Sequence, residues 1–447
     1  MTSVALRPHA AQLVRTPPAE AAAPIPRPAP AARLFNRDFV LLWQAQLVSQ
    51  FGNQAFSIAM VFWTADATHS ATMSGLMMMA SVLPVVLLAP LTGTFVDRRR
   101  SRLRIIVTCD LVAGAVVSLL ALGFAAGGGA FRPGLLFAVA LLIGTCNAFL
   151  DPAVNAFMPD LVPRKQIEAA NAFRESSRQL TILTAQGLGG ILYALFGPPL
   201  LFLLDGLSFL FAGTSEMMIR SDCRDGAQPP DRPPAPPTSQ TFFALTADGF
   251  RYMSAQPGMI GFLVLASVFN ALLMPMALLL PVYATVYLHA DVRWYGFLLA
   301  AINAGAIAGC TIVATRRLES SGRARRIVLL AAFAMLALSL AVLGQVRSRW
   351  IALVIAGTTG MLTGMINVSV ISIIQRRTSP QFRGRVVGLH AMMARVLVPL
   401  GLVGGGMFAD LTGRNVPLVF GVCSTLALTS VILLGARQST RAFLASE

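Results

Sequence analysis

The sequence predicts an all-α membrane protein with twelve transmembrane helices in two pseudo-symmetric six-helix bundles. Three observations lead to this fold class. The 447-residue chain is 55% hydrophobic and only 12% charged, with a mean hydropathy of +0.69, whereas a soluble protein has about 25% charged residues. Its apolar residues form long continuous segments of about 20 residues, the length that a helix needs to cross a bilayer. Arginine gathers in every second gap between these segments.

Each apolar segment is predicted as a helix, because the bilayer core offers no water to backbone polar groups and admits only helices and closed barrels. The segments lack the strict alternation of apolar and polar residues that barrel strands show. The predicted helices are 38–64, 73–96, 104–127, 133–158, 170–195, 199–219, 257–287, 293–314, 326–345, 350–374, 385–411 and 415–436.

The arginines predict the orientation of the chain. The gaps after the second, fourth, eighth and tenth helices hold clusters such as 98–100 and 376–377, whereas the other gaps hold isolated arginines. Cytoplasmic loops carry the excess of basic residues, so we expect a multi-pass protein of the plasma (inner) membrane with both termini in the cytoplasm. The net charge of +16 then reflects topology and lipid headgroup contacts, and nucleic acid is not expected as a partner.

A proline-rich gap divides the chain. Prolines from Pro229 to Pro237 predict a polar, semi-rigid cytoplasmic linker. The first residues are rich in alanine, proline and arginine and lack the apolar region of a signal peptide. The predicted domains are a disordered cytoplasmic tail at 1–34, an N-terminal six-helix bundle at 35–219, the linker at 220–256, a C-terminal six-helix bundle at 257–437 and a cytoplasmic tail at 438–447.

The two predicted bundles resemble each other in sequence, with an offset of 216 to 221 residues. Duplicated halves that rock about a site between them are a feature of secondary transporters. Chance recurrence of glycine in apolar helices is the alternative. The corresponding positions are Gly189, Gly190 and Gly197 in the first half and Gly405, Gly406 and Gly413 in the second, with Gly75 matched by Gly296.

The second predicted helix ends in Gly93-Thr-Phe-Val-Asp97-Arg98-Arg99-Arg100-Ser101-Arg102. This segment resembles the loop between helices 2 and 3 of the major facilitator superfamily, with its Gly-x-x-x-Asp-Arg core. The resemblance implies that Gly93 allows close helix contact and that Asp97 meets the N-terminal end of helix 11, where the helix dipole favours an anion. It implies that an arginine, Arg98 or Arg102, completes a latch that closes the cytoplasmic face. Asp151 is the candidate carboxylate for this network on helix 4.

A second stretch is similar to one branch of that superfamily, which contains enterobactin and macrolide exporters. The similar segments are Asp151-Pro-Ala-Val-Asn-Ala-Phe-Met-Pro-Asp-Leu-Val-Pro163, Ala170-Asn171-Ala172, Asp205-Gly-Leu-Ser-Phe209 and Arg383-Gly384-Arg385-Val386. The resemblance covers residues 35–437. Asn53 stands where the branch often has an acidic residue, and Ala185-Gln186 where it often has Gly-Pro. A neutral Asn53 cannot carry a proton, so a coupling carboxylate must lie elsewhere.

Polar residues form stripes on the predicted helices, at steps of three and four that place them on one helix face. In a bilayer such residues face an interior or a watery cavity, and the resemblance implies that helices 1, 4, 7 and 10 line that cavity. Hydrogen bonding between packed helices is the alternative. The candidate cavity residues are Gln50, Asn53, Gln54, Asn147, Asn155, Asn270, Met274, Thr363, Asn367 and Arg395.

Two carboxylates within the apolar spans, Asp151 and Asp205, are the candidates for proton coupling, because a charged residue is costly in lipid. Structural roles are the alternative: Asp151 in the gating network and Asp205 in helix packing. No catalytic residue, metal site or cofactor is predicted. The five cysteines lack metal-ligand spacing, and the chain contains no Gly-x-x-x-x-Gly-Lys phosphate loop.

The predicted function is secondary active efflux of amphipathic small molecules, antibiotic-like or siderophore-like, by alternating access with proton antiport. The direction of transport comes from the resemblance alone. The expected partners are a small-molecule substrate, protons and the lipid bilayer. The expected state is a monomer, and no enzymatic activity is expected. One alternative is a dedicated siderophore or metabolite exporter of a biosynthetic pathway. Another is a non-transporting sensor or scaffold, because a fold does not fix a function.

Overall fold

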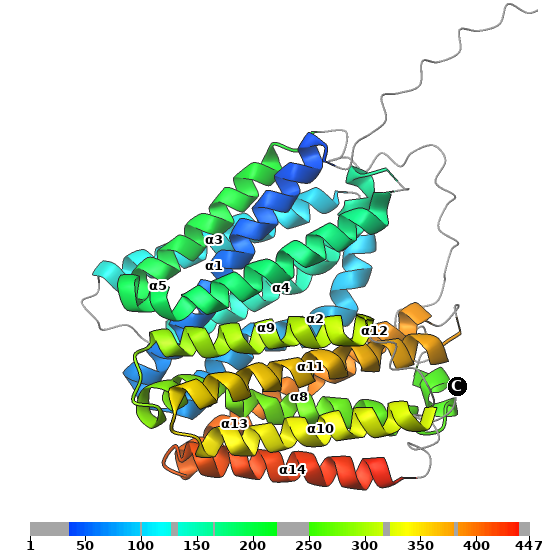
Figure 1. The fold of residues 1–447 in the computed structure, drawn as a ribbon. Coiled ribbons are helices and arrows are strands. Elements are labelled where there is room, and N and C mark those ends of the chain that lie inside the picture. The colour runs from blue at the N-terminus through cyan, green and yellow to red at the C-terminus, as the bar shows by residue number, and fades with distance from the viewer. Residues whose placement is uncertain are drawn as a thin grey trace, which may run out of the picture.

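The computed structural model describes residues 35–98, 101–126, 133–163, 166–220, 250–315, 322–379 and 383–437 (Figure 1). All the longer elements in these residues are helices, and the described residues contain no strand. The elements are α1 (Arg37–Thr68), α2 (Ala71–Arg98), α3 (Arg102–Ala126), α4 (Pro133–Leu161), α5 (Ile167–Met217), α8 (Met259–Val282), η2 (Tyr283–Tyr287), α9 (Arg293–Thr315), α10 (Gly322–Gln345), α11 (Arg349–Arg377), α12 (Arg383–Val396), α13 (Val398–Leu411) and α14 (Val416–Ala436).

Helix α5 covers the fifth and sixth predicted helices. A straight helix of its 51 residues would be about 75 Å long, more than twice the ~30 Å core of a bilayer. The chain instead turns at Gly197, whose φ of 67° is not helical. Tyr193, before the turn, contacts Asp66 near the end of α1, and Ser215, after it, contacts Gln44 near the start of α1. The two parts of α5 therefore run in opposite directions, as predicted for two helices.

Two other predicted helices differ in detail from the structure. The predicted helix 257–287 ends in a π-helical turn, η2, a distortion that is frequent at functional sites. The predicted helix 385–411 is divided into α12 and α13 at Leu397, close to Pro399, which cannot donate a backbone hydrogen bond. Residues 250–255, expected in the linker, are helical.

The described chain has the surface of a membrane protein. Ten of its helices are long and apolar enough to cross a membrane. Large apolar side chains such as Leu119 (67% exposed), Val354 (70%) and Leu411 (84%) point outward, as lipid contact requires. Helix α1 is not among the ten because its glutamines and Asn53 lower its hydropathy. The fold class, an all-α membrane protein, is confirmed, and twelve crossings follow only if α1 is counted and α5 is counted twice.

The two halves of the chain share a hydrophobic core at one end only. We call the end at which α1 begins and α2 and α11 end the arginine-rich end, and the other the opposite end. At the arginine-rich end each half has its own core, one around Phe157 and one around Phe262. At the opposite end a single core joins Ile58 and Phe62 of the first half to the second half. In Figure 1 the two groups of helices accordingly converge at one end and separate toward the other.

Glycines bring the helix backbones of the two halves together at the opposite end. A Cβ on Gly190 of α5 would lie 2.6 Å from the carbonyl oxygen of Val292, which directly precedes α9, and a Cβ on Gly406 of α13 would lie 2.6 Å from that of Ala71 in α2. These contacts pair the fifth helix with the eighth and the eleventh with the second, so the repeated glycines occupy equivalent places in the two halves. Gly197 and Gly413, also matched in sequence, both have positive φ, 67° and 63°.

We predict that Gly406→Ala destabilises the protein, while Gly404→Ala, two residues away on α13, does not. The new methyl group at position 406 collides with the backbone of α2, and overpacking costs about 1–3 kcal/mol. At position 404 no atom lies within 4 Å of the added Cβ, and alanine is the better helix former by about 0.5–1 kcal/mol. Thermal unfolding of the purified protein in detergent measures both effects. Equal melting temperatures for the two variants would show that the α2–α13 contact is not tight.

Candidate functional site

A cavity of about 550 Å³ lies between α1, α2, α4, α5 and α12. Its wall is predominantly polar, which inside a bilayer requires either water or a polar ligand. The lining residues are Gln46, Ser49, Gln50, Asn53, Gln54, Val82, Val85, Asn147, Leu150, Asp151, Asn155, Arg174, Glu175, Arg178, Ile182, Phe209 and Arg395.

The polar stripes predicted on the first and fourth helices both face this cavity. Asn147, Asp151 and Asn155 line it from α4, at steps of four residues. On α1 the cavity is lined by the glutamines and by Asn53. Gln54 also bonds away from the cavity: it accepts a hydrogen bond from Gln186 at 3.1 Å. These two helices supply all the side-chain amide groups among the lining residues.

A cluster of five charged groups lies in the cavity: Asp151, Arg174, Glu175, Arg178 and Arg395. Arg178 binds Glu175 through two hydrogen bonds, Nε to Oε2 at 2.9 Å and Nη2 to Oε1 at 2.5 Å, a bidentate geometry that fixes both side chains. Arg174 donates to the side-chain oxygen of Asn155. The charges of Arg174, Arg178 and Arg395 all act on Asp151. Three arginines and two carboxylates leave one formal positive charge in excess.

Three of these charged residues are not among the predicted site residues. Arg174 and Arg178 lie just beyond the basic gap after the fourth helix, within the predicted helix 170–195, and Glu175 lies between them. In the structure α5 begins at Ile167, so these residues lie on its first turns and face inward. The spacing of four residues between Arg174 and Arg178 is the signal that places both on one helix face.

Other predicted residues lie away from this cavity. Asn270, Met274, Thr363 and Asn367 do not line it. Thr363 donates to the carbonyl oxygen of Thr359 within α11, and Thr359 in turn bonds Ser339 of α10, the packing arrangement considered as the alternative. Asp205 is fully buried inside the first half, and a Cβ on Gly52 of α1 would lie 2.7 Å from its Oδ1.

The predicted gating motif is described only in part. The side chains of Gly93, Asp97 and Arg98 lie outside the described residues. Arg102 forms an ion pair with Asp160 at 3.0 Å and donates to the carbonyl oxygen of Ala156 at 2.9 Å. Arg102 therefore takes Asp160, and not Asp151, as its carboxylate on α4.

The opposite end is closed by polar contacts that the sequence does not reveal. The carboxylate of Asp410, near the end of α13, accepts hydrogen bonds from Ser70 Oγ (2.6 Å), Ala71 N (2.8 Å), Thr72 N (2.8 Å) and Thr72 Oγ1 (2.6 Å). These donors surround the first turn of α2, whose dipole favours a negative charge. Asp410 thus caps a helix of the other half. We call this contact the Asp410 cap.

Aromatic and amide groups add to the closure between the halves. Phe62 of α1 stacks on Tyr193 of α5 and meets Tyr295 of α9 edge to face, with both pairs of ring centroids 4.9 Å apart. Closer to the cavity, Asn303 of α9 donates to Gln186 Oε1 at 2.7 Å. Gln186, which replaces the proline expected from the resemblance, therefore bridges the two halves.

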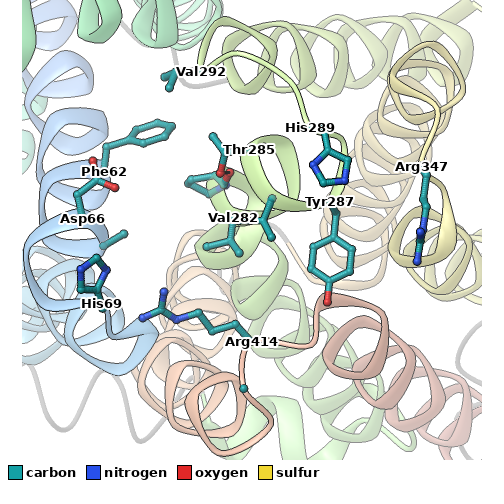
Figure 2. Close-up of a pocket in the computed structure, with 14 residues that line it drawn as sticks. Phe62, Asp66, His69, Val282, Thr285, Tyr287, His289, Val292, Arg347 and Arg414 are labelled. Atoms are coloured by element: carbon teal, nitrogen blue, oxygen red, sulfur yellow. Dashed lines mark hydrogen bonds between the residues drawn. The ribbon is translucent and has the colours of Figure 1, made fainter.

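A second pocket, of about 600 Å³, lies at the opposite end. Figure 2 shows the side chains of Asp66, His69 and Arg414 on one side of it and those of Tyr287 and His289 on the other. Phe62 also lines this pocket, so the aromatic contacts lie between it and the polar cavity.

Comparison with known proteins identifies related chains. The family model described as transmembrane secretion effector matches residues 29–445. Macrolide efflux protein A of Streptococcus pyogenes is 22% identical over 389 residues, which cover 84% of this chain and 90% of that protein. Multidrug efflux pump Tap of Mycolicibacterium fortuitum is 26% identical over 387 residues, again 84% of this chain and 90% of the relative.

Solved structures share the fold. The crystal structure of a nucleoside transporter superposes with a TM-score of 0.69 at 10% identity and covers 90% of this chain and 99% of its own. A bacterial homologue of the iron transporter ferroportin, in an inward-facing state, superposes with a TM-score of 0.65 at 16% identity, with the same coverage. At these identities the likeness establishes the fold alone.

We predict that the cavity holds water. In a variant without native cysteines, Asn147→Cys will react with a charged, water-soluble thiol reagent, whereas Ala148→Cys, on the next residue of α4, will not. Asn147 lines the cavity, while Ala148 is only 3% exposed. Labelling in membranes, followed by gel-shift analysis, measures both. If position 147 is as unreactive as position 148, the cavity is closed to water.

Proposed function

Because this chain belongs to the family of transmembrane secretion effectors within the major facilitator superfamily, we propose that it exports amphipathic small molecules by alternating access. It is a multi-pass membrane transporter and not an enzyme. The proposed location is the plasma (inner) membrane with both termini in the cytoplasm, and the proposed driving force is proton antiport. The observation that carries this proposal is the polar, charged cavity between two halves that are joined at one end only.

The orientation of the joined end indicates which side of the membrane the cavity faces in this state. Basic residues mark the cytoplasmic face of a membrane protein, so the arginine-rich end, where the halves have separate cores, faces the cytoplasm. The structure is then the inward-facing state, ready to receive a cytoplasmic substrate. The pocket around His69 and Arg414 becomes the outer vestibule, beyond the closed aromatic contacts.

The cavity wall suggests the chemistry of the substrate. Asparagine and glutamine side chains both donate and accept hydrogen bonds, and Val82, Val85 and Phe209 add apolar contacts. Such a wall suits a molecule with several hydroxyl or carbonyl groups on an apolar frame. A macrolide has this character, and two relatives carry macrolide or multidrug efflux in their names.

A dedicated siderophore or metabolite exporter is the second candidate. The excess positive charge of Arg174, Arg178 and Arg395 favours a ligand with an anionic group, as many iron chelators have. Accumulation of a panel of antibiotics and iron chelators in cells with and without the gene separates the two candidates. A sensor or scaffold would signal through its tail, so deletion of residues 1–30 would abolish its activity, whereas a pump would continue to export.

Proton coupling requires a carboxylate that binds and releases a proton during the cycle. Asp151 lies in the cavity among three arginines, where substrate and proton can compete for the same place. Asp205 lies deeper, against the backbone of α1 at Gly52. At either position, protonation of the carboxyl group can change how the helices of the first half pack.

We predict that inverted membrane vesicles containing the protein accumulate a labelled macrolide when their interior is acidic. Protons leaving the vesicle then drive substrate inward, which corresponds to export from the cell. Asp151→Asn will reduce this uptake to that of vesicles without the protein, because the neutral side chain cannot exchange a proton. Asp291→Asn, an exposed loop carboxylate paired with Arg293 at 3.4 Å, is the matched control. Full uptake by both Asp151→Asn and Asp205→Asn would remove both coupling candidates.

We predict that Asp410→Ala favours the outward-open state. The substitution removes the hydrogen bonds that make up this cap, and a hydrogen bond to a charged group is worth about 1.5–3 kcal/mol. A loss of about 1.4 kcal/mol already changes a two-state equilibrium tenfold. Spin labels on Ala67→Cys and Ser348→Cys, exposed at the opposite end on different halves, will show a longer distance by electron paramagnetic resonance.

Arg414→Ala is the control for this measurement. Arg414 lies 3.7 Å from Asp410 in a partly exposed ion pair, a contact worth less than about 1 kcal/mol. The distance distribution of this variant will stay close to that of the parent protein. If Arg414→Ala opens the end as far as Asp410→Ala does, the ion pair and not the Asp410 cap holds the closure.

A further inference from the structure

Two acidic side chains meet inside the first half, behind the cavity wall. Asp110 of α3 is 1% exposed and Glu216 of α5 is 0% exposed. The two carboxyl groups face each other across the contact of α3 with α5, where a Cβ on Gly213 would lie 3.4 Å from the backbone nitrogen of Leu111. Helices α3 and α5 pack closely along this stretch because α3 has a glycine at the contact: a Cβ on Gly114 would lie 2.8 Å from the backbone nitrogen of Leu210. The pair therefore lies in a dry, tightly packed part of the bundle.

Most of the oxygens in this pair lack a hydrogen-bond donor. Neither Oδ1 nor Oδ2 of Asp110, nor Oε2 of Glu216, accepts a hydrogen bond. Within the described part of the chain no basic side chain forms an ion pair with either carboxyl group. The other titratable groups nearby are Cys109 of α3 and Cys146 of α4, which interact with each other. Among the described residues, the helices that pack around the two acids therefore offer them no ion-pair partner.

A bound proton would remove both the repulsion between the two carboxyl groups and the lack of a hydrogen-bond donor. Two adjacent carboxylates in a low-dielectric environment cannot both stay ionised, and carboxylate pairs in enzymes share a proton for this reason. When one carboxyl group is protonated, its O–H donates to an oxygen of the other, so the missing hydrogen bond is formed. The geometry of Asp110 and Glu216 thus requires at least one bound proton.

Gln46 connects the pair to the cavity. Its Nε2 donates to Glu216 Oε1 at 3.0 Å, and the residue is also part of the cavity wall. With Nε2 directed to Glu216, the amide oxygen is the atom that can accept a hydrogen bond from the cavity side. When Glu216 gains a proton, its O–H can instead donate to that amide oxygen, and the amide turns its NH₂ group toward the cavity.

We propose that Asp110 and Glu216 form a further proton-binding site of this transporter, beyond the coupling candidates Asp151 and Asp205, with Gln46 as the positioning residue that links the protonation state of the pair to the cavity. The inference rests on the proposed proton antiport. A substrate hydroxyl or ammonium group binds the amide oxygen of Gln46, holds Nε2 on Glu216 and so favours the ionised form of Glu216. The pair then passes from two protons to one: the O–H bond of Glu216 breaks, its proton passes to cavity water, and the remaining proton stays on Asp110. Substrate binding and proton binding therefore oppose each other, as antiport requires.

The first experiment measures proton release. Erythromycin is added to the purified protein in weakly buffered detergent solution that contains a pH indicator. The wild type will release protons as the macrolide binds, whereas Asp110→Asn and Glu216→Gln will bind it with little or no release. Gln46→Leu keeps both carboxyl groups but will release fewer protons for each macrolide bound. Asp291→Asn, with its exposed carboxylate, will match the wild type.

The second experiment separates coupling from folding. In proteoliposomes, Asp110→Asn and Glu216→Gln will lose uptake of labelled erythromycin driven by an acidic interior but will keep erythromycin exchange, which needs no net proton movement. Variants that release protons and use the gradient as the wild type does would overturn the proposal. If the wild type exchanges erythromycin but neither releases protons nor uses the proton gradient, the proposed antiport on which the inference rests would be overturned.

A third measurement needs no variant. Infrared spectra of the wild type, with isotope-labelled aspartate and glutamate to identify the bands, will show a protonated carboxyl group at neutral pH that disappears in strong alkali. If no protonated carboxyl group is present at neutral pH, the pair does not hold a proton and the proposal fails, whether or not the substituted proteins fold.

Discussion

The absence of water from the bilayer core is the constraint on which this structure depends. Every polar group there must find its partner within the protein, because an unsatisfied group costs several kcal/mol. Helices satisfy the hydrogen-bonding groups of the backbone, so only the polar side chains still need partners. Leu119 and Leu411 face lipid, while Asn147 and Asp151 face a cavity that is large enough for water. The polar wall is therefore a place where the chain either holds water or holds a ligand that replaces it.

The two halves contribute unequally to this wall. Helices α1, α4 and α5 of the first half supply almost all of its hydrogen-bonding groups, and Arg395 of α12 is the one lining residue from the second half. The substrate, as proposed, is then held by the first half, and the second half moves past it. The buried acids Asp110 and Glu216 also belong to the first half, so substrate binding and proton binding would take place within the same rigid bundle.

The sequence predicts the fold class and one side of the site, for a physical reason. Helical periodicity is local, so the spacing of Asn147, Asp151 and Asn155 is enough to assign them to one helix face. The rotation of a whole helix bundle, in contrast, is set by contacts between residues far apart in the sequence, and local spacing cannot predict it. Whether Thr363 faces the cavity or a neighbouring helix depends on the state of the whole molecule, and here it lies away from the cavity. Arg174 lies inside the predicted helix 170–195 as well as inside α5, but an arginine near the cytoplasmic end of a helix is expected from topology alone, so its sequence position does not mark it as a cavity residue.

Buried acids illustrate a second limit. Asp110 and Glu216 lie within predicted apolar helices but are not among the predicted coupling residues, although a charged residue is as rare at their positions as at that of Asp205. Their pairing cannot be predicted from the sequence, because it depends on the packing of α3 against the second part of α5. That packing requires the turn at Gly197 and the close approach at Gly114. Composition can indicate candidate residues, but the contact between them is a property of the tertiary structure.

The Asp410 cap suggests how closure could alternate between the two ends. Asp410 lies near the end of the eleventh helix and binds the first turn of α2. The resemblance implies the reverse arrangement at the arginine-rich end, where Asp97, near the end of α2, meets the start of the eleventh helix. Both contacts would place an acid on the positive end of a helix dipole and would use the same two helices. Because packed halves move as rigid bodies, tilting them to form one contact separates the other. A single pair of helices could then close either end of the cavity, but not both at once.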